Sequence, residues 1–158
     1  MEAAVRHKAL RLLTYGLYVM TSGQDENLAA GTVNWLSQAS LRPPLIMAGV
    51  KLGSSLHKAI ERSSVFAVNI LDRTQKEIAR TFFKTARLKE DKLSGYAFER
   101  GKTGAPLLLD VPAFFECRVV DRLTRGDHSI FVGEVVNAGI RREATPLLLR
   151  DTGFSYGG

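Results

Sequence analysis

The sequence predicts a mainly β fold with a few helices, in which antiparallel strands close a barrel or nearly do so. Three observations predict it. The apolar segments are mostly short and rich in β-branched and aromatic residues, and Gly, Pro or polar residues separate them. Few segments show helical spacing. A chain of 158 residues with many short strands suits one barrel domain over residues 1–158.

The first third of the chain is expected to form a short helix over residues 1–13 and then strands. These strands are expected at 15–22, 32–40 and 45–50, with a turn at 23–27. Pro43 and Pro44 separate the last two strands, because proline has no N–H to donate to a ladder. The strand at 32–40 carries more amide and hydroxyl groups than a buried strand needs. It therefore suits a flat ligand with a polar edge.

Two further helices are expected in the middle of the chain. The first follows Gly53, has Ser54 or Ser55 as its N-cap and ends near Arg62. Residues 74–77 fit a capping box, and the helix behind them places four apolar side chains on one face: Ile78, Ala79, Phe82 and Phe83. A helix N-terminus can hold an anion, so the segment that begins the first helix is either a phosphate site or simply a cap.

The remaining strands are expected at 66–71, 113–123, 129–141 and 146–150, and residues 106–109 form a short apolar segment. The two long ones predict a hairpin around residues 124–127. Residues 84–104 are polar and contain glycine, which predicts a partly helical excursion and a candidate lid.

Composition and charge exclude several function classes. The formal net charge is +6, but the basic residues are scattered and not interleaved with aromatics, so a phosphate-bearing small ligand is expected rather than nucleic acid. No apolar run reaches the roughly 18 residues of a membrane span, so no membrane partner is expected. The histidines lie far apart, so no metal site is expected. Cys117 is the only cysteine and is expected to be a small buried hydrophobe. Without a signal-peptide pattern, a cytoplasmic location is expected.

Several segments, in order along the chain, carry a resemblance to a known family. They are Ala30–Ser40 with Leu41–Val50 behind the two prolines, Gly53–Ser55, Val65–Leu71, Phe115–Cys117 and Gly126–Val135. Together they resemble the flavin reductase-like, FMN-binding split-barrel family. Residues 16–22 and 34–36 look most like its electron-transfer and rubredoxin-linked branch. The resemblance implies a Greek-key-like antiparallel split barrel that binds FMN, with FAD as the other flavin, and that works as a homodimer.

The resemblance also implies site residues. The flavin ring and ribityl chain would follow Thr32, Val33, Asn34, Trp35, Leu36 and Ser37, and the phosphate would lie at the helix start with Lys51, Ser54, Ser55 and His57. Phe82, Lys84 and Phe154 are further candidate contacts. His128, in Gly126-Asp127-His128, is the catalytic candidate that would position the nicotinamide. Asp127 is expected to serve the turn rather than the imidazole.

Each of these residues also has a plainer interpretation. Residues 53–55 would be a cap, Trp35 a core residue and His128 a structural histidine.

The favoured hypothesis is an NAD(P)H-dependent flavin reductase, which transfers hydride from NADH or NADPH to flavin and supplies a redox protein or monooxygenase. The alternative is an electron-transfer flavoprotein with tightly bound FMN, which Trp35 favours because it is larger than the residue usual in reductases. A more remote alternative is a basic barrel that binds nucleic acid.

Overall fold

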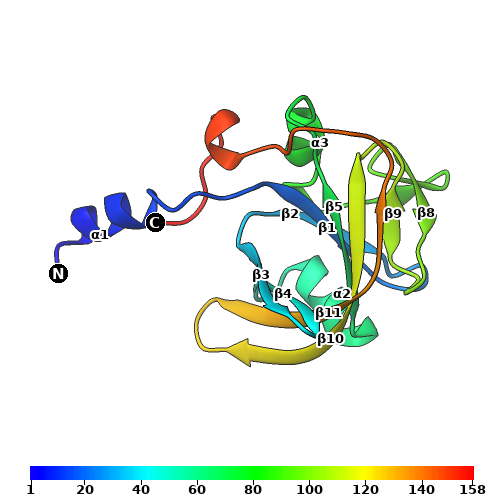
Figure 1. The fold of residues 1–158 in the computed structure, drawn as a ribbon, viewed down its shortest axis with the longest axis horizontal. Helices are drawn as coiled ribbons and strands as arrows, with labels where there is room; N and C mark the ends of the chain where they lie inside the picture. Colours follow the sequence, from blue (N-terminus) through cyan, green and yellow to red (C-terminus); the bar gives the residue numbers. More distant parts are fainter.

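Two antiparallel sheets and three α-helices make up the computed structural model, which describes residues 1–158 (Figure 1). The helices are α1 (Ala3–Leu10), α2 (Ser55–Ser63) and α3 (Lys76–Thr81), with a 3₁₀ turn at Leu149–Asp151. The larger sheet contains β1 (Tyr18–Ser22), β2 (Ala29–Val33), β3 (Leu36–Leu41), β4 (Pro44–Lys51), β5 (Val65–Ile70), β10 (Ala113–Thr124) and β11 (His128–Ile140). The smaller sheet contains β6 (Leu88–Lys89), β7 (Lys92–Leu93), β8 (Tyr96–Arg100) and β9 (Pro106–Leu108).

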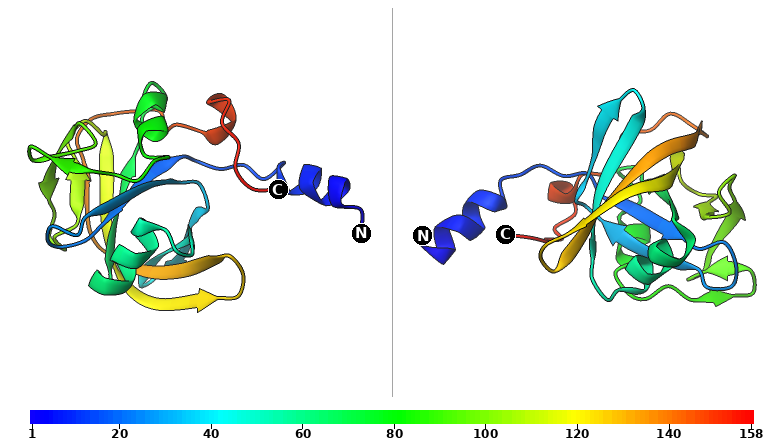
Figure 2. Two further views of the ribbon diagram at one scale, coloured as in Figure 1. Left: turned by 180° about the vertical axis from the view of Figure 1, so that it is seen from behind. Right: turned by 90° about the horizontal axis from the view of Figure 1, so that it is seen from below.

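The larger sheet has the strand order β2-β1-β5-β10-β11-β4-β3. Its two outermost strands, β2 and β3, follow each other in the chain with only Asn34 and Trp35 between them. The covalent connection therefore brings the two edges of the sheet together, and the sheet curls into a barrel that stays split between them (Figure 2). The predicted antiparallel, mainly β fold is confirmed.

The strand expected at 32–40 is two strands, so that prediction was wrong in detail. Val33 is the last residue paired with β1, and Leu36 is the first paired with β4. Between them, the carbonyl of Trp35 accepts the N–H of Gly49 at 2.8 Å. The unusual polarity of this stretch therefore marks the point where the chain changes partner strand.

The hairpin of β10 and β11 joins the two halves of the larger sheet, as predicted. β10 pairs with β5 on one side, and β11 pairs with β4 on the other. In the second pairing His128 lies opposite Lys51, and Ser129 lies opposite Val50. The hairpin tip is thereby held beside the loop that leads into α2, where the N–H of Leu52 donates to the carbonyl of Asp127 at 3.0 Å.

Helix α2 packs its apolar face into the main core. Leu56, Ala59 and Ile60 are buried together with Phe66 and Phe131 from two strands of the larger sheet. The hydroxyl of Ser54 accepts the N–H of His57 at 3.1 Å, which confirms the predicted cap. Cys117 is buried in the same core, as expected.

The stretch 84–104 was predicted to be partly helical, which is wrong: it forms β6, β7 and β8, and β9 completes the small sheet. Its first turn is made by Glu90 and Asp91, both with positive φ, and Leu93 anchors the sheet with 1% exposure. Local turn chemistry thus gave short strands where polarity alone suggested a flexible lid.

Two smaller predictions also fail. Thr74 does not cap α3, because its hydroxyl and its N–H both donate to Asp72 Oδ1 and the helix begins at Lys76. The expected strand at 146–150 reduces to isolated bridges at Pro146 and Leu148 followed by the 3₁₀ turn. In the first case the Asp72 carboxylate binds Thr74 in place of the N–H groups of α3. In the second case only single bridges form before the 3₁₀ turn, so no regular strand results.

Helix α1 stands outside the barrel beside the C-terminus, with no buried residue (Figures 1 and 2). It is one of the three helices, and none of them has the length and apolar character that a membrane crossing requires. The structure also contains no cluster of three or more His, Cys, Asp or Glu side chains arranged to hold a metal ion.

Candidate functional site

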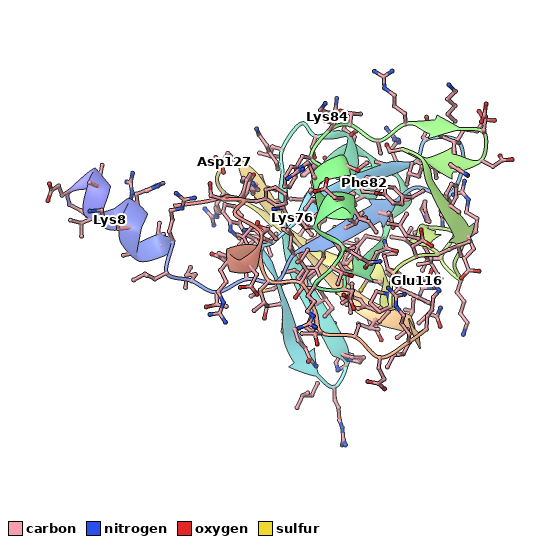
Figure 3. The ribbon with its side chains drawn as sticks, turned by 90° about the horizontal axis from the view of Figure 1, so that it is seen from above. Lys8, Lys76, Phe82, Lys84, Glu116 and Asp127 are labelled. Carbon is pink, nitrogen blue, oxygen red and sulfur yellow. The ribbon has the colours of Figure 1, made fainter.

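A cavity of about 800 Å³ lies where β2, β4, the start of α2, the end of α3 and the C-terminal tail meet. Phe82 and Lys84 reach it from the end of α3, and Asp127 marks the hairpin tip on the side toward α1 (Figure 3). Three lysines line the cavity, Lys51, Lys58 and Lys84, and no carboxylate does. The cavity is therefore suited to an anionic ligand.

The start of α2 forms one end of the cavity, which we call the anion end (Lys51 to Lys58). The first N–H groups of a helix have no intrahelical partner and carry the positive end of its dipole. Gly53 has φ +78°, and a side chain there would meet nothing within 4 Å. The Ser54 hydroxyl donates to the carbonyl of Lys51 at 2.8 Å, so the loop and the helix start are locked together.

The wall between the ends comes from β2 and its continuation. Thr32 is fixed to α3, because its hydroxyl donates to the carbonyl of Ala79 at 2.6 Å and its N–H donates to that of Phe82. Asn34 is 4% exposed, and its side-chain Nδ2 has no hydrogen-bond partner. A buried amide without a partner is costly, so a ligand acceptor at this position would satisfy it.

His128 also lines the cavity and belongs to a cluster at the hairpin tip, which we call the histidine end (Trp35, Asp127, His128 and Tyr156). The Nδ1 of His128 lies 2.7 Å from Asp127 Oδ1, and its Nε2 lies 2.7 Å from the Tyr156 hydroxyl. The ring of Trp35 packs against the imidazole with centroids 4.5 Å apart. With the Nδ1–H donating to the Asp127 carboxylate, the neutral imidazole accepts the Tyr156 O–H at Nε2. The expectation that Asp127 serves only the turn was wrong.

The contacts around His128 shift the pKa values of two of its neighbours. The hydrogen bond from His128, and then the charge that the imidazole carries when protonated, lower the pKa of Asp127. Burial raises the pKa of Tyr156, and the nearby Asp127 carboxylate raises it further. With these two shifts, Asp127 stays ionised and Tyr156 stays protonated at neutral pH, which are the forms that bond to His128.

The tail reaches the cavity through Phe154. The rings of Phe154 and Phe83 pack edge to face, with their centroids 4.8 Å apart. The charged ends of Lys76 and Arg80 lie 5.4 Å and 5.3 Å from the centre of the Phe154 ring. These contacts hold the tail across the end of α3, although Phe83 itself is 53% exposed. The cavity is thus covered on this side by aromatic side chains.

The structure brings ten of the fourteen predicted residues to this cavity. They are Thr32, Val33, Asn34, Lys51, Ser54, Ser55, Phe82, Lys84, His128 and Phe154. Trp35, Leu36 and Ser37 line an adjacent cavity of about 580 Å³ instead, which shares Gly49 and His128 with the first. The reason is the break after Val33, which turns the chain toward β4 and places the Trp35 ring over Gly49.

His57 lines neither cavity, and its side chain is 3% exposed. Its ring is directed into the protein, where both nitrogens have partners. Sequence reasoning also missed Lys58, although it follows Ser54 by four residues and therefore lies on the first turn of α2. Of the two aromatic residues near the C-terminus, Phe154 was selected as a candidate contact and Tyr156 was not.

A buried carboxylate outside the cavity has a structural role. Glu116 on β10 is fully buried and accepts the N–H groups of Lys102 and Thr103, the Thr103 hydroxyl and the Asn137 amide. Burial alone would raise the pKa of Glu116, but the bonds from Thr103, Asn137 and Lys102 outweigh it and the pKa is lowered. This carboxylate fastens the loop before β9 to the hairpin.

Comparison with known proteins gives a consistent result. The sequence pattern of the family described as "Flavin reductase like domain" matches residues 10–158. The chain is 32% identical over 146 residues to "FMN reductase (NADH) SmoA" of Agrobacterium fabrum, which covers 92% of this chain and 81% of that protein. It is 33% identical over 129 residues to "Probable flavin reductase" of Rhizobium meliloti, covering 79% of this chain but only 40% of that protein.

A solved structure shows the same fold. It is the NADH:FAD oxidoreductase of Streptomyces globisporus in complex with NAD and FAD fragments, with a TM-score of 0.81, 28% identity and coverage of 99% of this chain and 93% of that one. Because the family pattern spans nearly the whole chain and the fold agrees, the chain belongs to the flavin reductase-like domain family.

Proposed function

We propose that this protein is an NAD(P)H:flavin oxidoreductase that binds FMN in the 800 Å³ cavity. One observation carries the proposal: the cavity joins a lysine-lined helix start, a buried amide without a partner and a histidine with a fixed tautomer. A phosphate, a flat ring with polar edges and a nicotinamide need these three features in turn. The names of the relatives, an NADH-dependent FMN reductase and an NADH:FAD oxidoreductase, agree with it.

The residues present suit a flavin. The phosphate would be held by Ser54, Ser55 and the ammonium groups of Lys51 and Lys58, with Lys84 adding charge from the end of α3. The amide of Asn34 would donate to an acceptor on the ring, and the backbone of Thr32 and Val33 would border it. FAD would use the same phosphate position.

When bound, the flavin supplies the redox chemistry, accepting a hydride from NADH or NADPH. The chain supplies binding and geometry. Asp127 holds His128 in one tautomer and orientation, and His128 in turn orients the nicotinamide. Phe154 and Tyr156 exclude water from the site from the side of the tail. Such positioning is the main contribution a protein makes to hydride transfer.

A homodimer with a further electron acceptor is part of the proposal. Met47, Leu123 and Ile130 border the smaller cavity and are 43%, 51% and 40% exposed, so a second copy of the chain would bury them. The reduced flavin would be used by a redox protein or a monooxygenase. That residues 1–158 act as one unit and that they work in the cytoplasm stay predictions.

The test is the visible spectrum of the desalted protein, followed by FMN titration and an NADH and NADPH oxidation assay. Flavin bands or saturable FMN uptake, with rapid NAD(P)H oxidation, are expected. A colourless protein that takes up no FMN would overturn the proposal. Bound FMN with slow oxidation in excess free FMN would favour the electron-transfer alternative, and salt-sensitive oligonucleotide binding by a colourless protein would favour the nucleic-acid alternative.

A further inference from the structure

His57 belongs to the segment of the anion end, but its side chain does not line the cavity. Its backbone N–H donates to the hydroxyl of Ser54, the cap at the anion end, at 3.1 Å. Its ring Nε2 lies 2.7 Å from the hydroxyl of Ser129, the residue directly after His128. One residue therefore contacts both the cap of the helix start and the neighbour of the histidine.

The other partners of His57 make the network continuous. Its Nδ1 lies 2.6 Å from Glu61 Oε1, and Glu61 Oε2 lies 3.1 Å from Arg122 on β10. The Ser129 hydroxyl also lies 2.6 Å from that of Thr124, across the hairpin. With the Nδ1 proton donated to Glu61, Nε2 accepts from Ser129, and Ser129 accepts from Thr124. Each ring nitrogen and each hydroxyl in the chain therefore has a partner.

The order carboxylate, imidazole, hydroxyl also occurs in serine hydrolases. A nucleophilic role is excluded here, because Ser129 is fully buried and lines neither cavity. A substrate carbonyl could not reach its oxygen. The network must therefore act within the protein.

Its mechanical effect follows from where it attaches. The packing of Leu56, Ala59 and Ile60 buries α2, and the hydrophobic effect that drives this burial is non-directional. Hydrogen bonds are directional. The bond from Leu52 to Asp127 and the bond between His57 and Ser129 tie α2 and its entry loop to the hairpin at two separate points. Two directional attachments fix the helix relative to the strand.

We propose that His57 is a positioning residue, which sets the place of the anion end relative to His128, and that Glu61 holds its tautomer. This inference rests on the proposed function, because the two ends matter together only if one ligand phosphate and one nicotinamide are held at once. His57 touches neither ligand, so its effect passes through Ser54 and Ser129.

The main variant is Ser129→Ala, which removes the bond and leaves the imidazole in place. FMN affinity, measured by fluorescence titration, is expected to fall about five- to tenfold. Thr21→Val is the matched control, because the buried Thr21 hydroxyl donates to the carbonyl of Pro106 and Thr21 lines neither cavity. It should lower the melting temperature without changing the Kd for FMN. Equal loss of affinity in both variants would overturn the proposal.

A double-mutant cycle separates positioning from general destabilisation. Ser54→Ala removes the acceptor of the His57 N–H together with a proposed phosphate contact, and Ser129→Ala removes the partner of the His57 ring. Coupling through His57 predicts that the loss of FMN affinity in the double variant is smaller than the product of the two single losses. Ser54→Ala combined with Thr21→Val should show independent effects. If the Ser54 and Ser129 effects simply multiply, His57 does not couple the two ends.

Amide hydrogen exchange without flavin keeps this inference separate from the proposed function. Ser129→Ala should speed exchange of the His57 and Leu52 amides, which hold the start of α2, and Thr21→Val should not. Unchanged exchange overturns the role of His57 even if the wild type binds FMN. If the wild type binds no flavin, the proposed function fails, while the exchange result still decides whether His57 ties the two segments together.

Discussion

The two ends of the cavity are built in different ways. The anion end comes from one continuous segment, Lys51 to Lys58. Local bonds, Ser54 to Lys51 and His57 to Ser54, shape its loop and cap, and only Leu52 and His57 bond to the hairpin outside it. The histidine end is assembled from three separate segments, which contribute Trp35, Asp127 with His128, and Tyr156. The proposed phosphate site is therefore encoded locally, and the proposed nicotinamide site depends on the whole fold. Variants should therefore separate affinity for flavin from reaction with the nicotinamide.

The largest expected effect is at the histidine end. His128→Ala removes a partner of both Asp127 and the proposed nicotinamide, and kcat/KM for NAD(P)H should fall roughly 10- to 100-fold. The Kd for FMN should stay within about twofold, because the phosphate contacts are untouched. His7→Ala, on the exposed α1, is the matched control. A parallel rise in the Kd for FMN would show that the ends are not separable.

Glu116 provides a reference that belongs to neither end. Its pKa is lowered on folding, so its contribution to stability is complete above its ordinary value of 4.5 and is lost as the pH falls through the folded pKa. Glu116→Gln places an amide donor among existing donors and should cost about 1–3 kcal/mol of unfolding free energy at pH 7.

Urea unfolding of both proteins between pH 3 and pH 7 measures this effect. The difference between wild type and Glu116→Gln should shrink below pH 4.5, while FMN affinity at pH 7 stays the same. A constant difference over the whole range would mean that the charge of Glu116 contributes nothing to stability.

At the anion end, Ser54→Ala should raise the Kd for FMN about fivefold, because a lost N-cap costs about 1 kcal/mol and loosens the helix start. At saturating FMN, kcat should be unchanged. Ser54→Asp keeps a capping oxygen but adds a negative charge facing the proposed phosphate, so it should bind FMN worse than the alanine variant. Better binding by the aspartate variant would argue against a phosphate at this position.

The smallest effect is expected for Tyr156→Phe. The ring stays on Trp35, with centroids 5.2 Å apart in the wild type, and only the hydroxyl bonded to His128 is lost. The phenol is 47% exposed, so water can replace it, and kcat/KM for NAD(P)H should fall about two- to threefold. A change above tenfold, measured under the same conditions as His128→Ala, would make Tyr156 a principal residue of this end.

The same contrast explains how much could be predicted from the sequence. The Ser54 cap, the long hairpin and the strand at 65–70 follow from local patterns, and so does most of the anion end. The break at Asn34 and Trp35 depends on which strands pair, and no local signal reports that. His57 was assigned to the phosphate because of its sequence position, but the direction of its ring is set by Glu61 and Ser129. Tertiary partners decided each of these cases.

The burial of Cys117 has a consequence for the durability of the protein. Burial, with the adjacent Glu116 charge, raises the pKa of the thiol to about 12, so the thiolate that oxidants attack is essentially absent at neutral pH. Reduced flavins react with oxygen, and a flavin reductase works beside the peroxide that this reaction releases. The only thiol of the chain is shielded from that by-product.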